Sequence, residues 1–396
     1  MNKEQLEKSL ERRDVLKSGA AAVGALAMGG ASSSLFAAVE NEEWIPFEGA
    51  PRAKPGQLDW EGLDSWITPQ EQVFSVAHYG YPKVPAEKDY RLEISGEVEN
   101  AKSFSLDEIK ALPKKEHLMT LECSGNGVSE GFMAAIYNAK FTGTSLADFL
   151  KAAGIKKNAR EVVFYGYDKK VEKMKVGKKE EDIPFHFARS IPIDEALASN
   201  AILAYEANDK ALTAKNGFPL RLIRPGYYGI ANVKWLRGIE VWDRPYMGKY
   251  MAREYVTLRG ERKDDGEIVY KETSIGRMNL KSIIARATRK KTADGKESVM
   301  IYGAVWGPDA EEIAAVEVRV DEGKWEKAKL DEKPRAKHCW IFFSYEWKGA
   351  SKGKHQVVSR GIAKDGHIQP SKTDDEIALK KTGREAYAQY PRVIVV

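Results

Sequence analysis

The sequence has few of the side chains that bind metals and redox groups on their own. Its 396 residues include only two cysteines and six histidines, and no two histidines have the i, i+4 spacing of a helical metal site. There is no Cys-x-x-Cys pair, which excludes the common iron–sulfur, zinc and covalent haem motifs. Neither a Gly-x-Gly-x-x-Gly fingerprint nor a Walker loop is present. A redox metal in this chain would therefore depend on one cysteine and a large organic ligand.

The sequence also lacks a strong charge of one sign and a long apolar run. The 63 basic residues are nearly balanced by 58 acidic residues, so we expect no nucleic-acid partner. The densest basic run, Lys169 to Lys179, is followed directly by Glu180, Glu181 and Asp182. We interpret it as a solvated surface insertion rather than a docking patch. No segment contains the roughly 20 apolar residues of a membrane span, so we expect none in the mature chain.

Residues 1–39 are predicted to be a twin-arginine signal peptide. Arg12 and Arg13 precede a short, weakly apolar stretch from Ala20 to Ala31 that is rich in Ala and Gly. Glu11 stands where Ser or Thr is usual, and no clear cleavage site precedes residue 40. An amphipathic surface helix with a chance arginine pair is the alternative. The signal predicts a periplasmic protein and favours a complex cofactor, because this pathway exports proteins that are already folded.

The rest of the chain divides into regions that differ in their expected secondary structure. Residues 40–245 interleave short strands and helices with long loops, which predicts an α+β domain after an irregular wrapping segment that extends to residue 90. Residues 246–280 read as a connecting segment. Residues 281–396 contain regular short strands separated by turn signals, which predicts an immunoglobulin-like β-sandwich.

Several elements can be placed from local signals. Ser105 and Ser145 are expected to cap helices, with Pro113 and Gly154 ending them. A helical turn is expected at 193–198. Strands are expected at 91–96, 118–122, 162–165, 202–206, 219–224 and 233–242, and in the sandwich at 282–288, 299–305, 314–320, 340–347 and 355–361.

The two cysteines have different surroundings. Cys339 lies in the apolar run His-Cys-Trp-Ile-Phe-Phe and is expected to be a buried core residue. Cys123 lies in Leu-Glu-Cys-Ser-Gly-Asn-Gly, where turn-forming residues follow a strand and can present the thiol. The spacing alone does not exclude a disulfide between them.

The run from Leu118 to Gly127 resembles the molybdenum-binding loop of the sulfite oxidase family. In that family one cysteine completes a metal centre that is otherwise held by pterin dithiolene sulfurs and oxo groups. The resemblance implies that Cys123 is the metal ligand and a catalytic residue. A soft thiolate suits this metal, and the glycines allow the tight turn.

Further blocks resemble the family in order and spacing. They are Phe74 to Pro82, Leu203 to Asp209, Asn216 to Gly226 and Asn232 to Leu236. The resemblance implies a sulfite oxidase-type molybdopterin-binding domain with a molybdenum–molybdopterin cofactor. The cofactor-binding residues that it implies are His78, Tyr79, Cys123, Asn216, Arg221, Asn232, Val233 and Lys234. It also implies a catalytic tyrosine, Tyr205, beside the metal.

The C-terminal region resembles the family's β-sandwich dimerisation domain. The matching pieces are Gly303 to Trp306 and Arg360 to Pro370. The resemblance therefore covers roughly residues 45–396 and implies a homodimer.

The sequence departs from the family at the arginines that bind sulfite. Val76, Val128 and Ala231 occupy positions where the family places cations. Burying a dianion without paired cations costs free energy, so the resemblance to the family does not imply that sulfite is the substrate. Arg224 stands where the family generally has an apolar residue, and it can either restore a catalytic positive charge or point outward.

The expected function is oxygen-atom transfer on a small sulfur compound, in the manner of sulfite oxidation. Because the chain has no haem motif, its electrons are expected to go to a separate periplasmic c-type cytochrome. One alternative is a reductase of sulfoxides or N-oxides, which also needs no sulfite arginines. A second alternative is a non-catalytic β-sandwich binding protein in which the α+β domain is a degenerate scaffold.

Overall fold

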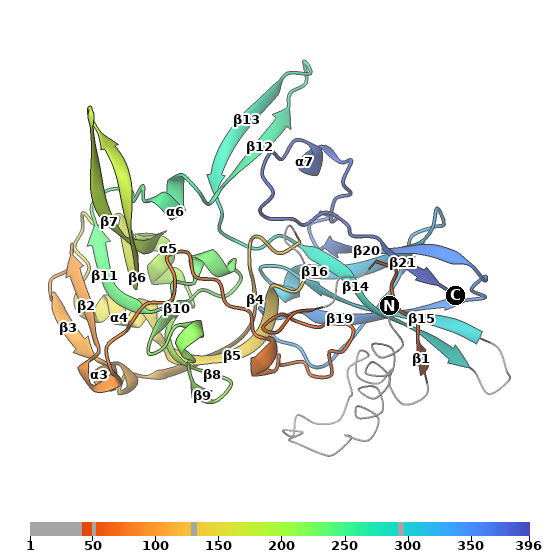
Figure 1. Ribbon diagram of the computed structural model, residues 1–396, viewed down its shortest axis with the longest axis horizontal. Helices are drawn as coiled ribbons and strands as arrows, with labels where there is room; N and C mark the ends of the chain where they lie inside the picture. The colour runs from red at the N-terminus through yellow and green to blue at the C-terminus, as the bar shows by residue number, and fades with distance from the viewer. Residues whose placement is uncertain (1–41, 50–52, 128–132, 292–296) are drawn as a thin grey trace. The chain divides into compact units, whose positions relative to one another are not determined.

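Strands make up most of the ordered structure, and the helices are short. The computed structural model describes residues 42–49, 53–127, 133–291 and 297–396 (Figure 1). The predicted signal peptide at 1–39 lies outside these residues. The described residues belong to one compact unit. Within them, no helix is long and apolar enough to cross a membrane.

The first half of the chain folds into two sheets with short helices, as the α+β prediction requires. One sheet has the order β3-β2-β11-β6-β7, and the other has the order β10-β8-β5-β4 with β9 added to β8. The strands are β2 Arg91–Gly96, β3 Lys102–Ser105, β4 Lys114–Glu122, β5 Ile136–Ser145, β6 Glu161–Val176, β7 Lys179–Pro192, β8 Ile202–Ala207, β9 Lys210–Ala211, β10 Arg221–Ile223 and β11 Leu236–Trp242. The helices are α3 Leu106–Lys110, α4 Leu146–Ala153 and α5 Ile193–Ala198.

The helix ends follow the signals seen in the sequence. Helix α3 begins at a capping box, in which Glu108 N donates to Ser105 Oγ at 3.2 Å and Ser105 N donates to Glu108 Oε2 at 2.7 Å. Helix α4 is capped by Ser145 and ends at Gly154, whose φ of 72° favours a residue without a Cβ. Both predicted helices are confirmed within one or two residues.

The second half is a β-sandwich, as predicted. One sheet has the order β1-β14-β15-β19-β18 and the other β17-β16-β20-β21. The strands are β1 Glu42–Trp44, β14 Lys281–Lys291, β15 Glu297–Trp306, β16 Ile313–Val320, β17 Glu326–Lys327, β18 Lys329–Leu330, β19 Ile341–Lys348, β20 Lys354–Ala363 and β21 Arg392–Val395, and helix α7 spans Asp375–Ala378. Apolar side chains such as Val299, Val316, Phe343 and Val357 form one buried cluster in this sandwich.

The predicted wrapping segment does cover part of the sandwich. The Trp60 ring stacks on Trp306 of β15, with centroids 5.9 Å apart. Arg286 of β14 donates from Nε to the backbone oxygen of Glu61 at 2.9 Å. Trp60 Nε1 also donates to Met133 O at 2.9 Å, so the residues before β2 pack against both halves of the chain.

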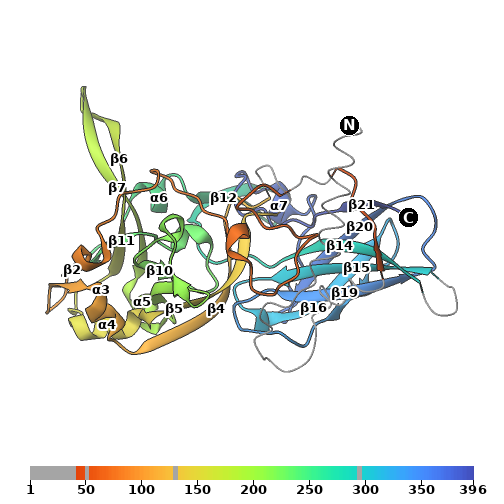
Figure 2. The ribbon, with the colours of Figure 1, turned by 60° about the horizontal axis from the view of Figure 1, so that its bottom comes forward.

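Two regions are more regular than their sequences suggest. The segment expected to be a connection contains helix α6 (Lys249–Ala252) and the hairpin of β12 (Val256–Arg262) and β13 (Ile268–Ser274). The basic run of Lys169 to Lys179 forms the outer part of the β6–β7 hairpin, which projects in both views (Figure 1 and Figure 2). Most side chains near its tip are exposed, so the hairpin lacks the apolar alternation that marks a half-buried strand.

Candidate functional site

An open cavity lies beside the end of β4. The residues that line it are Phe74, Ser75, Val76, His78, Leu121, Cys123, Ser124, Tyr137, Asp168, Phe187, Asn216, Arg221, Gly229, Ile230, Asn232, Lys234, Trp235 and Tyr255. The cavity thus brings together five predicted cofactor residues that lie far apart in the sequence, together with Cys123.

Cys123 follows β4 directly and begins a tight turn. Its backbone N–H donates to Ala135 O at 2.9 Å, and Asn126 N donates to Cys123 O at 2.9 Å. The N–H of Gly125 donates to Cys123 Sγ at 3.4 Å. Burial raises the pKa of this thiol, and the Gly125 N–H partly offsets that effect. Because Cys123 and Cys339 are both free, the disulfide left open by the sequence is absent.

A buried cation, Arg221, and a half-buried one, Lys234, lie together in the cavity wall. Arg221 donates from Nη1 to Asn216 O at 2.9 Å, while its Nε has no partner in the described structure. Lys234 Nζ donates to three neutral oxygens, namely Ser75 Oγ at 3.0 Å, Val76 O at 2.9 Å and Lys215 O at 3.1 Å. Burial and the charge of Arg221 lower the pKa of Lys234 to about 7. An anion at this position would stabilise both cations, as a phosphate group does.

Asp168 is a cavity residue that the sequence did not single out. Its side chain is 3% exposed, and its Oδ1 accepts no hydrogen bond in the described structure. Burial raises the pKa of this carboxyl to about 6. The β6–β7 register shifts between Tyr165 and Lys169, and this irregularity surrounds Asp168. An unpaired buried acceptor suits the N–H groups of a polar fused ring.

His78 lines the cavity, whereas Tyr79 does not. The His78 ring stacks between aromatic rings, with centroid distances of 5.4 Å to Phe187 and 4.9 Å to Tyr250. Burial, followed by the charges of Lys234 and Arg384, lowers the pKa of His78 to about 4. Its imidazole is therefore neutral at physiological pH. Tyr79 instead packs edge-on against Tyr250, at 5.3 Å between centroids.

The structure does not place Tyr205 at the cavity, which corrects the expectation that it lies beside the metal. Tyr205 belongs to the large core cluster, whereas its strand neighbour Ala204 packs with the cavity residues Leu121 and Tyr137. Successive side chains of a strand point to opposite faces, so Tyr205 faces away from the cavity. Lys110 Nζ, from α3, lies 6.0 Å from the Tyr205 ring.

Arg224 also lies outside the cavity lining, but it is only 6% exposed, so it neither lines the cavity nor points into solvent. Its guanidinium pairs with Glu195 of α5 and lies 3.5 Å from the Tyr227 ring centroid. It therefore supplies no positive charge to the cavity wall. Val233 is fully buried in the core, and its backbone oxygen accepts from Leu222 N at 2.8 Å. Its neighbours Asn232 and Lys234 are the residues of that segment that reach the cavity.

Val76, Ala231 and Val128 stand where the family has cations, and the first two differ in their surroundings. Val76 lines the cavity and is 45% exposed, so this part of the wall is apolar where a cation was possible. Ala231 is 2% exposed and is not among the lining residues. Val128 lies outside the described residues.

Arg384 brings a positive charge to this region from the other end of the chain. Its guanidinium lies 4.0 Å from the ring centroid of Tyr255, a cavity residue, and donates to Glu254 O. Its charge adds to the burial and the Lys234 charge that lower the pKa of His78, and it opposes the burial that raises the pKa of Cys123. The adjacent Glu385 N donates to Ser124 O at 2.6 Å, which fastens this segment to the cysteine loop.

Comparisons with known proteins agree with this geometry. Residues 78–250 match the family model of the oxidoreductase molybdopterin binding domain, and residues 272–380 match that of the Mo-co oxidoreductase dimerisation domain. The mitochondrial sulfite oxidase of Drosophila melanogaster is 31% identical over 351 residues, covering 82% of this chain and 59% of that protein. The NADH nitrate reductase of Volvox carteri is 28% identical over 310 residues, covering 71% of this chain and 35% of that protein.

A solved structure shows the same fold. The sulfane dehydrogenase SoxCD from Paracoccus pantotrophus superposes with a TM-score of 0.69 at 21% sequence identity, covering 96% of each chain. The chain spans less than two thirds of the length of both curated relatives described above. Those relatives bear the names of different substrates, so likeness to them does not select one.

Proposed function

Because the chain belongs to the sulfite oxidase family of molybdopterin oxidoreductases, we propose that it oxidises a small sulfur compound by oxygen-atom transfer. The observation that carries the proposal is the presence of the Cys123 thiol in the same cavity as Arg221 and Lys234. A single soft ligand and an anion-binding wall are the two features that a molybdenum–pterin cofactor needs from a protein.

The residues of the cavity fit this cofactor. Cys123 is the proposed metal ligand, and Arg221 and Lys234 are the proposed partners of its phosphate. Asn216 and Asp168 offer polar groups to the pterin ring, whereas the Asn232 side chain already bonds Arg224 N and Tyr228 O. When bound, the cofactor supplies a metal that accepts two electrons and exchanges an oxygen atom. The chain's own part is to fix the thiolate, neutralise the phosphate and hold His78 neutral beside the site.

The charge around the site limits the substrate. Arg384 is not a lining residue, but its guanidinium lies over the ring of the lining residue Tyr255, whereas Val76 removes a cation that a sulfite site would have. A single cation offsets one negative charge, whereas a buried dianion would keep a second charge without a partner. We therefore propose a sulfite-like sulfur compound that carries a single negative charge or binds with its charge toward Arg384.

The remaining parts of the proposal follow from the sequence. The chain has no Cys-x-x-Cys-His motif, so a separate periplasmic c-type cytochrome is the proposed electron acceptor. Arg12 and Arg13 support export by the twin-arginine pathway. The β-sandwich is the proposed surface for a homodimer, in keeping with its match to the Mo-co oxidoreductase dimerisation domain.

A reductase of sulfoxides or N-oxides is the second candidate. Phe74, Val76, Phe187 and Ile230 give the cavity an apolar part that suits a neutral substrate. The third candidate is a non-catalytic binding protein. It would give no role to the neighbouring cations Arg221 and Lys234 or to the unpartnered Oδ1 of Asp168.

Two assays separate these candidates. Elemental analysis of the purified protein should find about one molybdenum per chain, and its absence would refute the proposal. Oxidation of sulfite with ferricyanide should then be compared with reduction of a sulfoxide by reduced viologen. A clear excess of the second rate would replace the oxidase by the reductase.

A further inference from the structure

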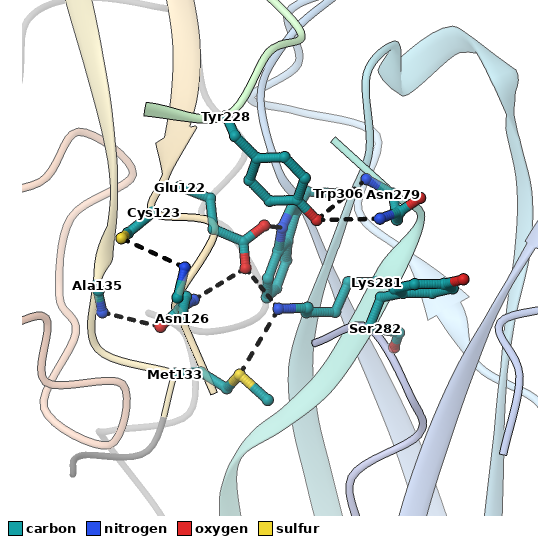
Figure 3. Close-up of polar contacts among 12 residues, drawn as sticks. Glu122, Cys123, Asn126, Met133, Ala135, Tyr228, Asn279, Lys281, Ser282 and Trp306 are labelled. Carbon is teal, nitrogen blue, oxygen red and sulfur yellow. Dashed lines mark hydrogen bonds and ion pairs between the residues drawn. The ribbon is translucent and has the colours of Figure 1, made fainter. Parts of the chain in front are cut away.

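A buried ion pair stands directly behind the cysteine loop. Glu122, the last residue of β4, and Lys281, the first residue of β14, are 0% and 1% exposed, and Lys281 Nζ lies 2.5 Å from Glu122 Oε1 (Figure 3). Glu122 precedes Cys123 in the chain, whereas Lys281 belongs to the β-sandwich. The pair therefore connects the two halves of the protein at the residue next to the proposed metal ligand.

Both oxygens of the Glu122 carboxylate are held by directed donors. Trp306 Nε1 donates to Oε2 at 2.8 Å, and Asn126 Nδ2 donates to Oε1 at 3.0 Å beside the Lys281 contact. Lys281 and Trp306 are cross-strand partners in the β14–β15 pair, so one end of the sandwich presents both donors. Three donors from two parts of the fold leave the carboxylate little rotational freedom.

The same contacts continue into the turn that carries the thiol. Asn126, which donates to Glu122, also accepts from Ala135 N through Oδ1 at 3.0 Å and donates its backbone N–H to Cys123 O at 2.9 Å. Ala135 O in turn accepts from Cys123 N at 2.9 Å. Hydrogen bonds thus connect Lys281 to Glu122, Glu122 to Asn126, and Asn126 and Ala135 to the backbone C=O and N–H of Cys123. The first two of these connections are drawn in Figure 3.

Stability alone does not account for such a pair. Replacing a buried ion pair by apolar groups of similar size is often neutral or stabilising, because desolvation offsets the attraction between the charges. What the charged pair adds is direction, since each oxygen accepts at a defined angle. Side chains behind a metal ligand tune the site by fixing the orientation of that ligand.

We infer that Glu122 and Lys281 are positioning residues, through which the β-sandwich fixes the Cys123 thiol for its metal. The inference rests on the proposed function and deepens it. It assigns the second domain a part in the active site besides any part in dimerisation. It also assigns Trp306 a supporting role as the second donor to Glu122.

The test compares the charge-free double variant Glu122→Gln/Lys281→Met with a matched control. The control, Glu317→Gln/Arg360→Met, removes an ion pair between β16 and β20, whose contacts are 2.7 Å and 2.9 Å long. The readouts are the molybdenum content, the melting temperature, the electron paramagnetic resonance spectrum of half-reduced molybdenum, and kcat and KM separately.

For Glu122→Gln/Lys281→Met we expect a melting temperature within about 4 °C of the wild type, since both charges are removed together. We expect an altered paramagnetic spectrum and a kcat lower by about 10–100-fold with KM nearly unchanged. The control should keep the wild-type spectrum and kcat. Single variants such as Lys281→Met leave one charge buried and should melt lower than the double variant.

The outcome separates the inference from the proposed function. A stable, molybdenum-loaded double variant with the wild-type spectrum and kcat would overturn the positioning role and leave the proposed function intact. A double variant that does not fold would also overturn it, because the pair would then be structural. A wild-type protein without molybdenum would instead refute the proposed function.

Discussion

The guanidinium of Arg384 lies over the ring of Tyr255, 4.0 Å from its centroid, and so places a charge from the C-terminal segment beside the cavity. Glu385 holds this segment in place, since its carboxylate accepts from Arg259 Nη2 at 2.6 Å and from Thr257. A distant part of the chain therefore holds a cation beside a cavity whose wall is apolar at Val76.

Replacing Arg384 by Met should weaken the binding of an anionic substrate. Loss of one charged interaction raises KM by about 10–100-fold. The KM of a neutral sulfoxide should stay within about 3-fold, because it makes no ion pair. The control is Arg244→Met, which removes a charge that is 70% exposed at the end of β11. An equal rise in KM for the anionic and the neutral substrate would contradict the role given to Arg384.

Replacing Val76 by Arg should improve sulfite as a substrate. Val76 lines the cavity and is 45% exposed, so a longer side chain can enter without displacing the core. One added cation should lower the KM for sulfite by about 10-fold or more at low salt. The matched control is Val171→Arg, on the exposed part of the β6–β7 hairpin. No difference between the two variants would show that charge at this position does not limit sulfite binding.

Replacing Asp168 by Leu should reduce cofactor retention. The carboxyl offers a buried oxygen without a partner, and loss of a hydrogen bond to it should weaken binding by about 10-fold. Asp168→Asn keeps one acceptor oxygen and should lose less. Pterin fluorescence after denaturation measures the bound cofactor, and the exposed helix residue Asp148 provides the control variant Asp148→Leu. Full occupancy in Asp168→Leu would exclude a contact with the cofactor.

His78 should make the unloaded protein less stable in acid. The pKa of the folded imidazole is about 4, and the ordinary value is 6.5. As the pH falls from 6.5 toward 4, the unfolded chain binds a proton that the folded chain does not. The free energy of unfolding therefore decreases, by at most about 3 kcal/mol from this group. Urea unfolding from pH 7 to pH 4 should show a shallower decrease in His78→Gln. Parallel curves for the two proteins would contradict a neutral buried imidazole.

The local signals of the sequence predicted much of the fold. Ser105, Ser145 and Gly154 mark helix ends through local capping and backbone conformation. The strands of the sandwich can be recognised from their apolar residues. The β6–β7 hairpin was read only as a charged insertion, because its outer part is solvated and shows no apolar period. The β12–β13 hairpin was likewise read as a connection.

The site was predictable where one motif carries its residues and not where distant segments meet. Cys123, Asn216, Arg221 and Lys234 were identified from ordered blocks, and the structure brings them to one cavity. Tyr205 was misplaced because sequence order does not tell which face of a strand meets the cavity. Asp168 depends on an irregularity in strand pairing, and Arg384 on packing between distant segments. Neither leaves a local signal.

The central claim is that Cys123 binds molybdenum, and X-ray absorption at the molybdenum edge tests it most directly. The wild type should contain molybdenum with one more sulfur neighbour than Cys123→Ser, whose activity should fall by more than about 100-fold. The control Cys339→Ala removes a thiol that is 2% exposed and should keep both the sulfur count and the activity. Identical sulfur counts in the wild type and Cys123→Ser, or no molybdenum in the wild type, would contradict the claim.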